Sequence, residues 1–181
     1  MLGGFPALRP TSRATSAAAI AAAVSPGRGS EERLSPRLFG GFLARNMAIL
    51  VNIDVPDLKA GITFYTQAFD LTVKRHLGEQ AAELSGWPVP VFLLEKAAGS
   101  AGAADSRRSY QRHWTPVHLD VVVTDLEGAV SRAAEAGARV EQDVRTAVWG
   151  KIAVLADPFG HGLCLIQFLN RGYDELAGPP P

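Results

Sequence analysis

The sequence has few of the features that mark disulfide-stabilised, membrane-spanning or nucleic-acid-binding proteins. Its single cysteine, Cys164, excludes an intramolecular disulfide and a thiolate metal cluster within one chain, so a reducing, cytoplasmic compartment is expected. No apolar run reaches the roughly 18 to 20 residues that a membrane-spanning helix needs. Basic and acidic residues number 18 each, which gives no net charge. We therefore expect no nucleic-acid and no membrane partner, and a small-molecule ligand remains.

The first 46 residues differ in composition from the rest of the chain. They contain six arginines, only two acidic residues, Glu31 and Glu32, and a small-residue run at 17–23. No period that could bury a core face is present. The segment fits a disordered leader, a transit-type presequence or translated upstream sequence before a start at Met47. We favour the last, because patterned sequence begins directly after Met47, and expect a chain starting there to fold as stably as the whole.

Residues 48–95 predict a strand, a helix and three further strands. Ala48 to Val55 is a β-type run, and Asp57 follows as a candidate helix N-cap. Spacing of i, i+4, i+7 and i+11 places one apolar stripe on the helix. The stripe consists of Leu58, Ile62, Tyr65 and Phe69. The three strands are expected at about 71–78, 80–85 and 89–95, between glycine and proline turns.

The same pattern restarts after a small-residue linker at about 96–113. A β-type run at 116–123 and a second N-cap, Asp125, precede a helix whose apolar positions lie 68 residues after those of the first. This is an internal repeat. Its remaining strands are expected at about 139–144, 149–156 and 162–168, and a proline turn at 157–160. The sequence thus predicts an α+β protein with one domain at 47–169. It contains two βαβββ modules, at about 47–96 and 114–169, and a tail follows at 170–181.

Three stretches of this repeat resemble the vicinal oxygen chelate superfamily of glyoxalases, bleomycin-resistance proteins and extradiol dioxygenases. They are residues 52–71, 118–136 and 157–162, and the likeness covers nearly all of 48–169. Asp70 departs from the glycine that usually follows the first helix, which should alter a loop more than the fold. The resemblance implies a curved, partly open eight-stranded sheet around a cleft that binds a small molecule.

The first strand of each module has one apolar and one polar face. The apolar face should lie beneath the helix, because the helix must bury its stripe on the sheet. That face contains Val51, Ile53 and Val55 in the first module and Val117, Leu119, Val121 and Val123 in the second. In the resembled fold the opposite face lines the cleft, which makes Asn52, Asp54, His118 and Asp120 candidate binding residues. A solvent-facing polar strand surface is the alternative.

Metal-binding members of the resembled superfamily take ligands from the first and last strands of each module. His118 occupies the first-strand histidine position of the second module, whereas Leu50 stands at that position in the first. Cys164 replaces the usual last-strand glutamate of the second module. It could coordinate as a thiolate, but a lone buried cysteine is more often an apolar filler. In the first module, Glu95 lies near the last-strand position. If the register is shifted by two residues, Leu93 lies there instead.

A catalytic divalent metal commonly needs three or more protein ligands. We therefore expect that no metal binds. If one does bind, we expect His118 and Glu95 to be its ligands.

Several candidate residues have equally good structural interpretations. Arg112 and Trp114 could bind an anionic or aromatic ligand, or pack at a module or subunit boundary. Trp87 and Trp149 could wall the cavity or lie at the edge of the core. His118 could contact the ligand or be an interior group that hydrogen-bonds to Asp120. The pattern assigns no catalytic residue.

Two functions fit the sequence. One is a glyoxalase-like enzyme that transforms a small oxygen-bearing metabolite, with His118 and Glu95 as metal ligands or acid/base groups. The other is a non-catalytic binding or sequestering protein of bleomycin-resistance type. The loss of standard ligands at Leu50 and Cys164 favours either this second function or an enzyme that works without a metal. Fold resemblance does not choose between them. A homodimer, or an equivalent pairing of the two modules, is expected, because open sheet edges prefer to be paired or covered.

Overall fold

The computed structural model describes residues 48–178, which belong to one compact unit. The expectations for residues 1–46 and for the start at Met47 lie outside this range, as do residues 179–181. None of the helices in 48–178 has the length and apolar character required to cross a membrane.

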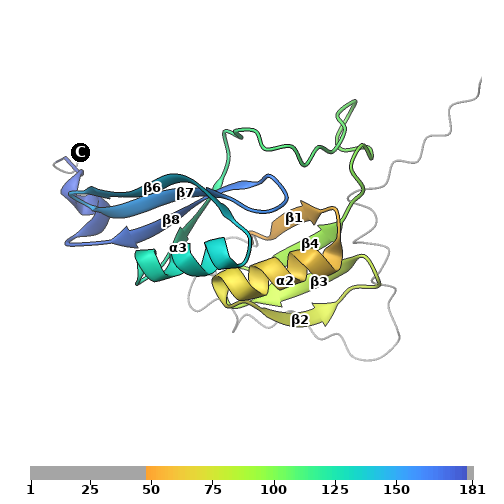
Figure 1. Ribbon diagram of the computed structural model, residues 1–181, viewed down its shortest axis with the longest axis horizontal. Coiled ribbons are helices and arrows are strands. Elements are labelled where there is room, and N and C mark those ends of the chain that lie inside the picture. The colour runs from red at the N-terminus through yellow and green to blue at the C-terminus, as the bar shows by residue number, and fades with distance from the viewer. Residues whose placement is uncertain (1–47, 179–181) are drawn as a thin grey trace, which may run out of the picture. The chain divides into compact units, whose positions relative to one another are not determined.

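The first module is a four-stranded sheet covered by one helix (Figure 1). Its elements are β1 (Val51–Val55), α2 (Leu58–Phe69), β2 (Thr72–His76), β3 (Ala81–Ser85) and β4 (Val91–Glu95). The strand order is β1-β4-β3-β2, with β1 parallel to β4 and the other pairs antiparallel.

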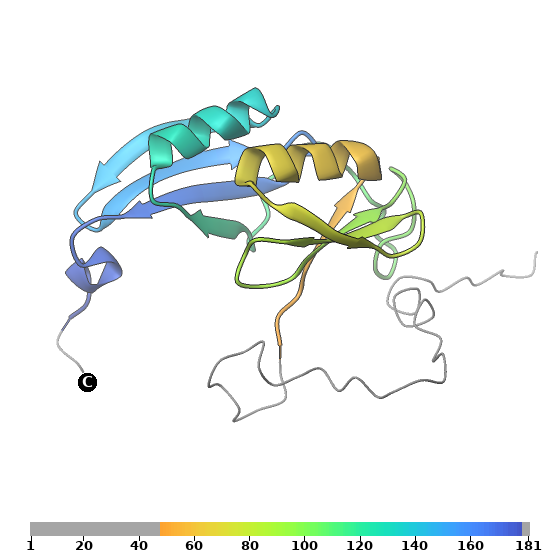
Figure 2. The same cartoon turned by 90° about the horizontal axis from the view of Figure 1, so that it is seen from below.

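The second module repeats this arrangement. It consists of β5 (Leu119–Val122), α3 (Leu126–Glu135), β6 (Arg139–Ala147), β7 (Gly150–Ala156) and β8 (Gly162–Phe168), and a short 3₁₀ helix, Gly172–Glu175, follows. The order β5-β8-β7-β6, with β5 parallel to β8, is the order of the first sheet. Figure 2 shows α2 and α3 on the same side of the two sheets. The predicted α+β fold of two βαβββ modules is confirmed, as two four-stranded sheets that do not close into a barrel.

Both helices begin with the same pair of side-chain contacts. Asp57 Oδ1 accepts a hydrogen bond from Ala60 N at 2.7 Å, and Asp125 Oδ1 accepts one from Gly128 N at 3.1 Å, as the sequence predicts for N-caps. A last-strand side chain accepts from the first residue of each helix. Glu95 Oε2 lies 2.9 Å from Leu58 N, and Gln167 Oε1 lies 3.1 Å from Leu126 N. These contacts fix each helix start to its own sheet.

The core lies between the helices and the apolar strand faces. Ile53 and Val55 are buried there, and Leu119 and Val121 pack against the same core. The stripe predicted on α2 is rotated slightly, because Phe64 and Ala68 are fully buried whereas Ile62 and Phe69 are only half-buried.

Val117 is the exception to the predicted apolar face. Its side chain is 85% exposed, because β5 begins only at Leu119 and residues 116 and 117 form a bend. Pro116 has no N–H with which to continue a strand ladder.

The turn at 157–160 joins the two modules. Tyr65 Oη donates to the buried Asp157 Oδ2 at 2.8 Å, and the Phe64 and Phe159 rings meet edge to face at 6.3 Å. Asp157 also accepts hydrogen bonds from Phe159 N at 2.9 Å and His161 N at 2.8 Å. Burial, and then the Asp157 charge, raises the pKa of Tyr65 well above its ordinary value. A single carboxylate thus links α2 to the β7–β8 turn.

Candidate functional site

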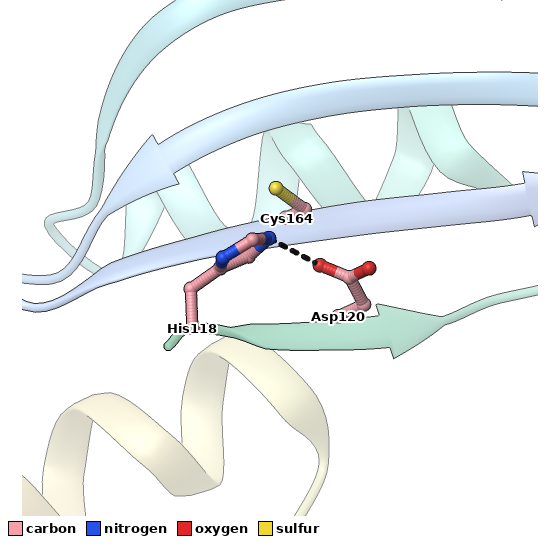
Figure 3. A group of neighbouring side chains, drawn as sticks. All are labelled: His118, Asp120 and Cys164. Carbon is pink, nitrogen blue, oxygen red and sulfur yellow. Dashed lines mark ion pairs between the residues drawn. The ribbon is translucent and has the colours of Figure 1, made fainter. Parts of the chain in front are cut away.

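Three of the predicted site residues meet on the face of the second sheet that lies opposite α3. Asp120 on β5 is the parallel neighbour of Cys164 on β8, and His118 directly precedes β5. His118 Nε2 lies 3.1 Å from Asp120 Oδ1, and a donor atom of each of the three residues lies within 4.8 Å of the others (Figure 3). We call His118, Asp120 and Cys164 the polar cluster.

The polar cluster contains one buried side chain and two partly exposed ones. Cys164 is only 4% exposed, whereas the side chains of His118 and Asp120 are 30% and 44% exposed. Burial first, and then the charge of Asp120 and a hydrogen bond to it, raises the pKa of the Cys164 thiol to about 11. The thiol is therefore protonated at neutral pH and is not a ready nucleophile.

Trp114 extends this site on its solvent side. Its ring centroid lies 5.2 Å from that of His118, and the residue is 61% exposed. An accessible indole beside an imidazole offers an aromatic surface next to hydrogen-bonding groups.

An apolar cavity of about 440 Å³ is lined by residues of both modules, including every residue of β5. The first module contributes Val51, Ala68, Phe69, Trp87, Pro88 and Val89, and the second contributes Leu119 to Val123, Ala129 and Arg132. Asp120 and Arg132 are the charged residues of this wall. Asp120 therefore belongs to both the cavity wall and the polar cluster.

Trp87 lies at the cavity, whereas Trp149 does not. The Trp87 ring packs on Phe69 at 5.6 Å within the cavity wall. Trp149 packs instead on Tyr173 at 5.0 Å and on Phe168 at 6.3 Å, beyond the end of β8. Its interpretation as an element of the core edge fits these contacts better than that of a cavity wall.

The polar face of β1 is separate from the polar cluster. Asn52 is exposed, and Asp54 Oδ2 pairs with Arg108 Nε of the intermodule segment at 2.6 Å. The side chain of Arg108 is only 14% exposed in this pair. Asp54 thus holds the segment that follows the first module against β1.

Arg112 is committed to an ion pair and is not a free cation. Its Nε and Nη2 donate to the two carboxylate oxygens of Glu141 at 2.9 and 2.8 Å. The Arg112 hydrogen bond is the main cause that lowers the pKa of Glu141 to about 2, and Arg139 contributes further. This bidentate pair ties the segment before β5 to β6. Packing at a module boundary, one of the two interpretations of Arg112, therefore fits its contacts.

The first module does not supply the side chains that the resembled family uses as metal ligands. Asn52 pairs with Phe92 as Asp120 pairs with Cys164, so Phe92 stands where the last-strand ligand would be. Glu95 lies on the helix side, with Leu58 N on its carboxylate, and Leu93 is buried in the core. Leu50 has no donor atom. His118 therefore has no metal-ligand partner from the first module among the described residues.

Comparison with known proteins extends these observations. The glyoxalase-like domain family matches residues 50–166. The uncharacterized protein Rv0887c of Mycobacterium tuberculosis is 30% identical over 138 residues, which cover 71% of this chain and 79% of that protein.

Solved structures show the same fold. A glyoxalase/bleomycin resistance protein/dioxygenase family enzyme from Burkholderia phytofirmans has a TM-score of 0.51 at 18% identity, over 66% of this chain and 97% of that one. The fosfomycin resistance protein FosX from Listeria monocytogenes has a TM-score of 0.54 at 14% identity, over 69% and 95% of the two chains. At these identities the likeness concerns the fold alone.

Proposed function

This chain belongs to the glyoxalase-like domain family of the vicinal oxygen chelate superfamily, and we propose that it binds a small oxygen-bearing organic molecule in the cavity between its modules. The observation that carries the proposal is the position of Asp120, which joins the apolar cavity wall to the polar cluster. A cavity of 440 Å³ is within the range of small-molecule sites. Such sites typically combine an apolar lining with a few polar groups that orient the ligand.

The cavity provides both parts of that combination. Phe69, Trp87 and Val121 offer apolar surface, and Arg132 offers a donor to a ligand oxygen. His118 and Trp114 border Asp120 on its solvent side. We propose Asn52, Asp54, Arg112 and Trp149 as no more than indirect contributors, because none of them lines the cavity or belongs to the polar cluster.

Binding without chemistry, of bleomycin-resistance type, is the function that these residues support best. The buried thiol is protonated, and the first module lacks the family's metal ligands. A second candidate, acid/base catalysis by His118, is favoured by one contact. Asp120 Oδ1 lies 3.1 Å from His118 Nε2 and can orient the imidazole as carboxylates do in general-base pairs. The structural neighbours include both a resistance protein and an enzyme, so the fold alone does not decide.

We also propose a cytoplasmic homodimer. β1 and β5 are the outer strands of their sheets, and each keeps one edge without a strand partner within 48–178. A second copy could cover these edges. The free thiol of Cys164 is compatible with a reducing compartment.

Filling the cavity should weaken binding more than tenfold while preserving the fold. We expect the full chain to bind 8-anilinonaphthalene-1-sulfonate, a fluorophore with an apolar ring system and one anionic group that suits Arg132. Val89 is half-buried in the loop before β4 and lines the cavity, so Val89→Trp should occupy its volume. Losing roughly 100 Å² of apolar contact at about 25 cal/mol per Å² weakens binding more than tenfold. Fluorescence titration measures this change.

Val73→Trp is the matched control, because Val73 is 39% exposed on the edge strand β2 and does not line the cavity. It should leave the dissociation constant of the fluorophore unchanged. Equal affinity in wild type and Val89→Trp, or no binding by folded wild type, would contradict the cavity as the site.

A further inference from the structure

We propose that the ligand of the cavity is an N-acylated amino acid, whose amide group hydrogen-bonds to the outer edge of β5 and whose carboxylate pairs with Arg132. This inference rests on the proposed function and names the chemical class of the molecule that the cavity binds. It places the ligand against a strand edge and α3, whereas the family resemblance places the ligand on the polar face of the sheet.

The cavity follows the edge of β5 that has no strand partner within 48–178. All residues of β5 line it, and so does Val123, which comes next. Successive residues of a strand point to opposite faces of a sheet, so one cavity touches all of them where it passes around an edge of the strand. The other edge of β5 is covered by β8. The cavity therefore contains the outer edge.

Two residues of β5 present backbone hydrogen-bonding groups at this outer edge. Val123 N donates to Ile166 O at 2.7 Å, so the backbone groups of Val123 and, by alternation, of Val121 point toward β8. The N–H and C=O groups of Asp120 and Val122 then point away from β8, and they have no hydrogen-bond partner among the described residues. Such groups need partners when water is displaced. A ligand amide supplies one donor and one acceptor, as a neighbouring strand does.

The charges of the lining set the direction of the ligand. Arg132 is the one cation and Asp120 the one acid among the described residues that line the cavity. Arg132 forms no ion pair within 48–178, in contrast to Arg108 and Arg112. A guanidinium binds a carboxylate through two parallel hydrogen bonds. Because Asp120 repels an anion, the ligand carboxylate lies toward Arg132 and the amide group lies nearer Asp120.

The first module supplies the surface for the apolar part of the ligand. The rings of Phe69 and Trp87 pack together at 5.6 Å, and Pro88 and Val89 line the cavity beside them. An aromatic acyl group or side chain fits such a surface. An aromatic wall, a strand edge and a cation thus match the apolar group, the amide and the carboxylate of an N-acyl amino acid. A homodimer that pairs through β1 leaves the outer edge of β5 open to this ligand.

Isothermal titration calorimetry of the full chain with N-benzoyl-L-phenylalanine tests the ligand class. Two analogues each change one group. O-benzoyl-L-phenyllactic acid lacks the amide N–H, and N-benzoyl-L-phenylalanine methyl ester lacks the negative charge. Loss of one hydrogen bond should weaken binding of the first roughly 3- to 10-fold, and loss of a charged pair should weaken binding of the second more than tenfold. Equal affinity for all three, or no binding of N-benzoyl-L-phenylalanine by folded wild type at millimolar concentration, would overturn the inference.

Arg132→Gln should weaken binding of N-benzoyl-L-phenylalanine more than tenfold and leave binding of its methyl ester unchanged. Arg171→Gln is the control, because Arg171 lies beyond β8, pairs with Glu175 and does not line the cavity. It should bind both compounds as the wild type does. Equal losses in the two variants would contradict the role of Arg132.

Two substitutions of Val122 test the strand edge. Val122→Pro removes an N–H that no ladder bond uses, whereas Val122→Ala shortens the side chain and keeps that N–H. Binding of N-benzoyl-L-phenylalanine should be several-fold weaker in the proline variant than in the alanine variant. Equal affinity in the two would contradict the edge contact. If Val122→Pro does not fold, the comparison of amide and ester on wild type still tests this contact.

Binding of 8-anilinonaphthalene-1-sulfonate separates this inference from the proposed function. A wild type that binds the fluorophore, loses it in Val89→Trp and yet shows equal affinity for the three probes would keep the cavity as a site and overturn the amide ligand. Sedimentation identifies the other occupant of the edge. If a second copy covers β5, Val122→Pro should shift a dimer toward the monomer while N-benzoyl-L-phenylalanine does not bind, which would also overturn the inference.

Discussion

Replacing Asp157 with alanine should lower the free energy of unfolding by about 3 to 5 kcal/mol, because it removes the acceptor of three hydrogen bonds and each buried donor left unpaired costs about 1 to 3 kcal/mol. The Asp157 side chain is fully buried and accepts hydrogen bonds from Tyr65 Oη, Phe159 N and His161 N. Alanine leaves these donors without an acceptor in a buried site, and each such group carries a desolvation penalty. Because Tyr65 belongs to the first module, the loss should also loosen the contact between modules.

Urea denaturation of full-length wild type and Asp157→Ala measures this loss. Asp143→Ala is the control, because Asp143 is exposed on β6. Its substitution should change the free energy of unfolding by about 0.5 kcal/mol or less. If both variants lose equally little, the Asp157 network does not hold the modules together.

Gly160→Ala should cost the second largest amount of stability, about 2 to 4 kcal/mol, as expected for a steric clash combined with a strained backbone. Gly160 has a φ of +89°, and a Cβ there would lie 2.5 Å from the Tyr110 carbonyl oxygen. That contact is with backbone, which cannot move aside without displacing residues 110–112. These residues lead into Trp114 and His118, so the substitution should also perturb the polar cluster.

Gly99→Ala separates the two causes of this loss. Gly99 has a similar φ of +74° but no atom within 4 Å of a Cβ. It should therefore lose only about 1 kcal/mol, the cost of a positive φ without a clash. Thermal or urea unfolding of both variants measures the difference. Equal losses would show that residues 110–112 do not pack tightly against the 157–160 turn.

Local patterns in the sequence predict most of the fold. Asp57 and Asp125 mark the helix starts, and the offset of 68 residues between the helices identifies the repeat. Strand alternation also predicts that His118 and Asp120 share one face. These features depend on neighbouring residues, which is why they can be read before any tertiary contact is known.

The metal-ligand positions depend on long-range register and were predicted less well. Glu95 and Gln167 make equivalent contacts with the helix starts, yet they are 72 residues apart rather than 68. The second module has a longer β6, of nine residues against five in β2. The true counterpart of Cys164 is therefore Phe92, not Glu95 or Leu93.

Arg112 and Trp149 illustrate the same limit. Arg112 is held by Glu141, 29 residues later, and Trp149 packs on Tyr173 beyond the last strand. Neither partner follows from local spacing. The cavity itself is formed by residues of both modules and becomes visible only when the modules are placed together.

We propose that the polar cluster is a functional surface rather than a structural hydrogen-bond network. His118→Ala tests it most directly, through a urea titration combined with fluorophore binding. His118 and its partner Asp120 are both partly exposed, so water can solvate Asp120 after the substitution. Removal of His118 also takes away the imidazole that pairs with Asp120. The unpaired Asp120 carboxylate should then disfavour binding of the anionic fluorophore beside it.

We predict that His118→Ala lowers the free energy of unfolding by about 1 kcal/mol or less. The same variant should bind 8-anilinonaphthalene-1-sulfonate several-fold more weakly, as loss of about 1 kcal/mol implies. A stability loss of roughly 2 to 3 kcal/mol, the cost of stranding a buried partner, with unchanged affinity in the folded protein would contradict the claim.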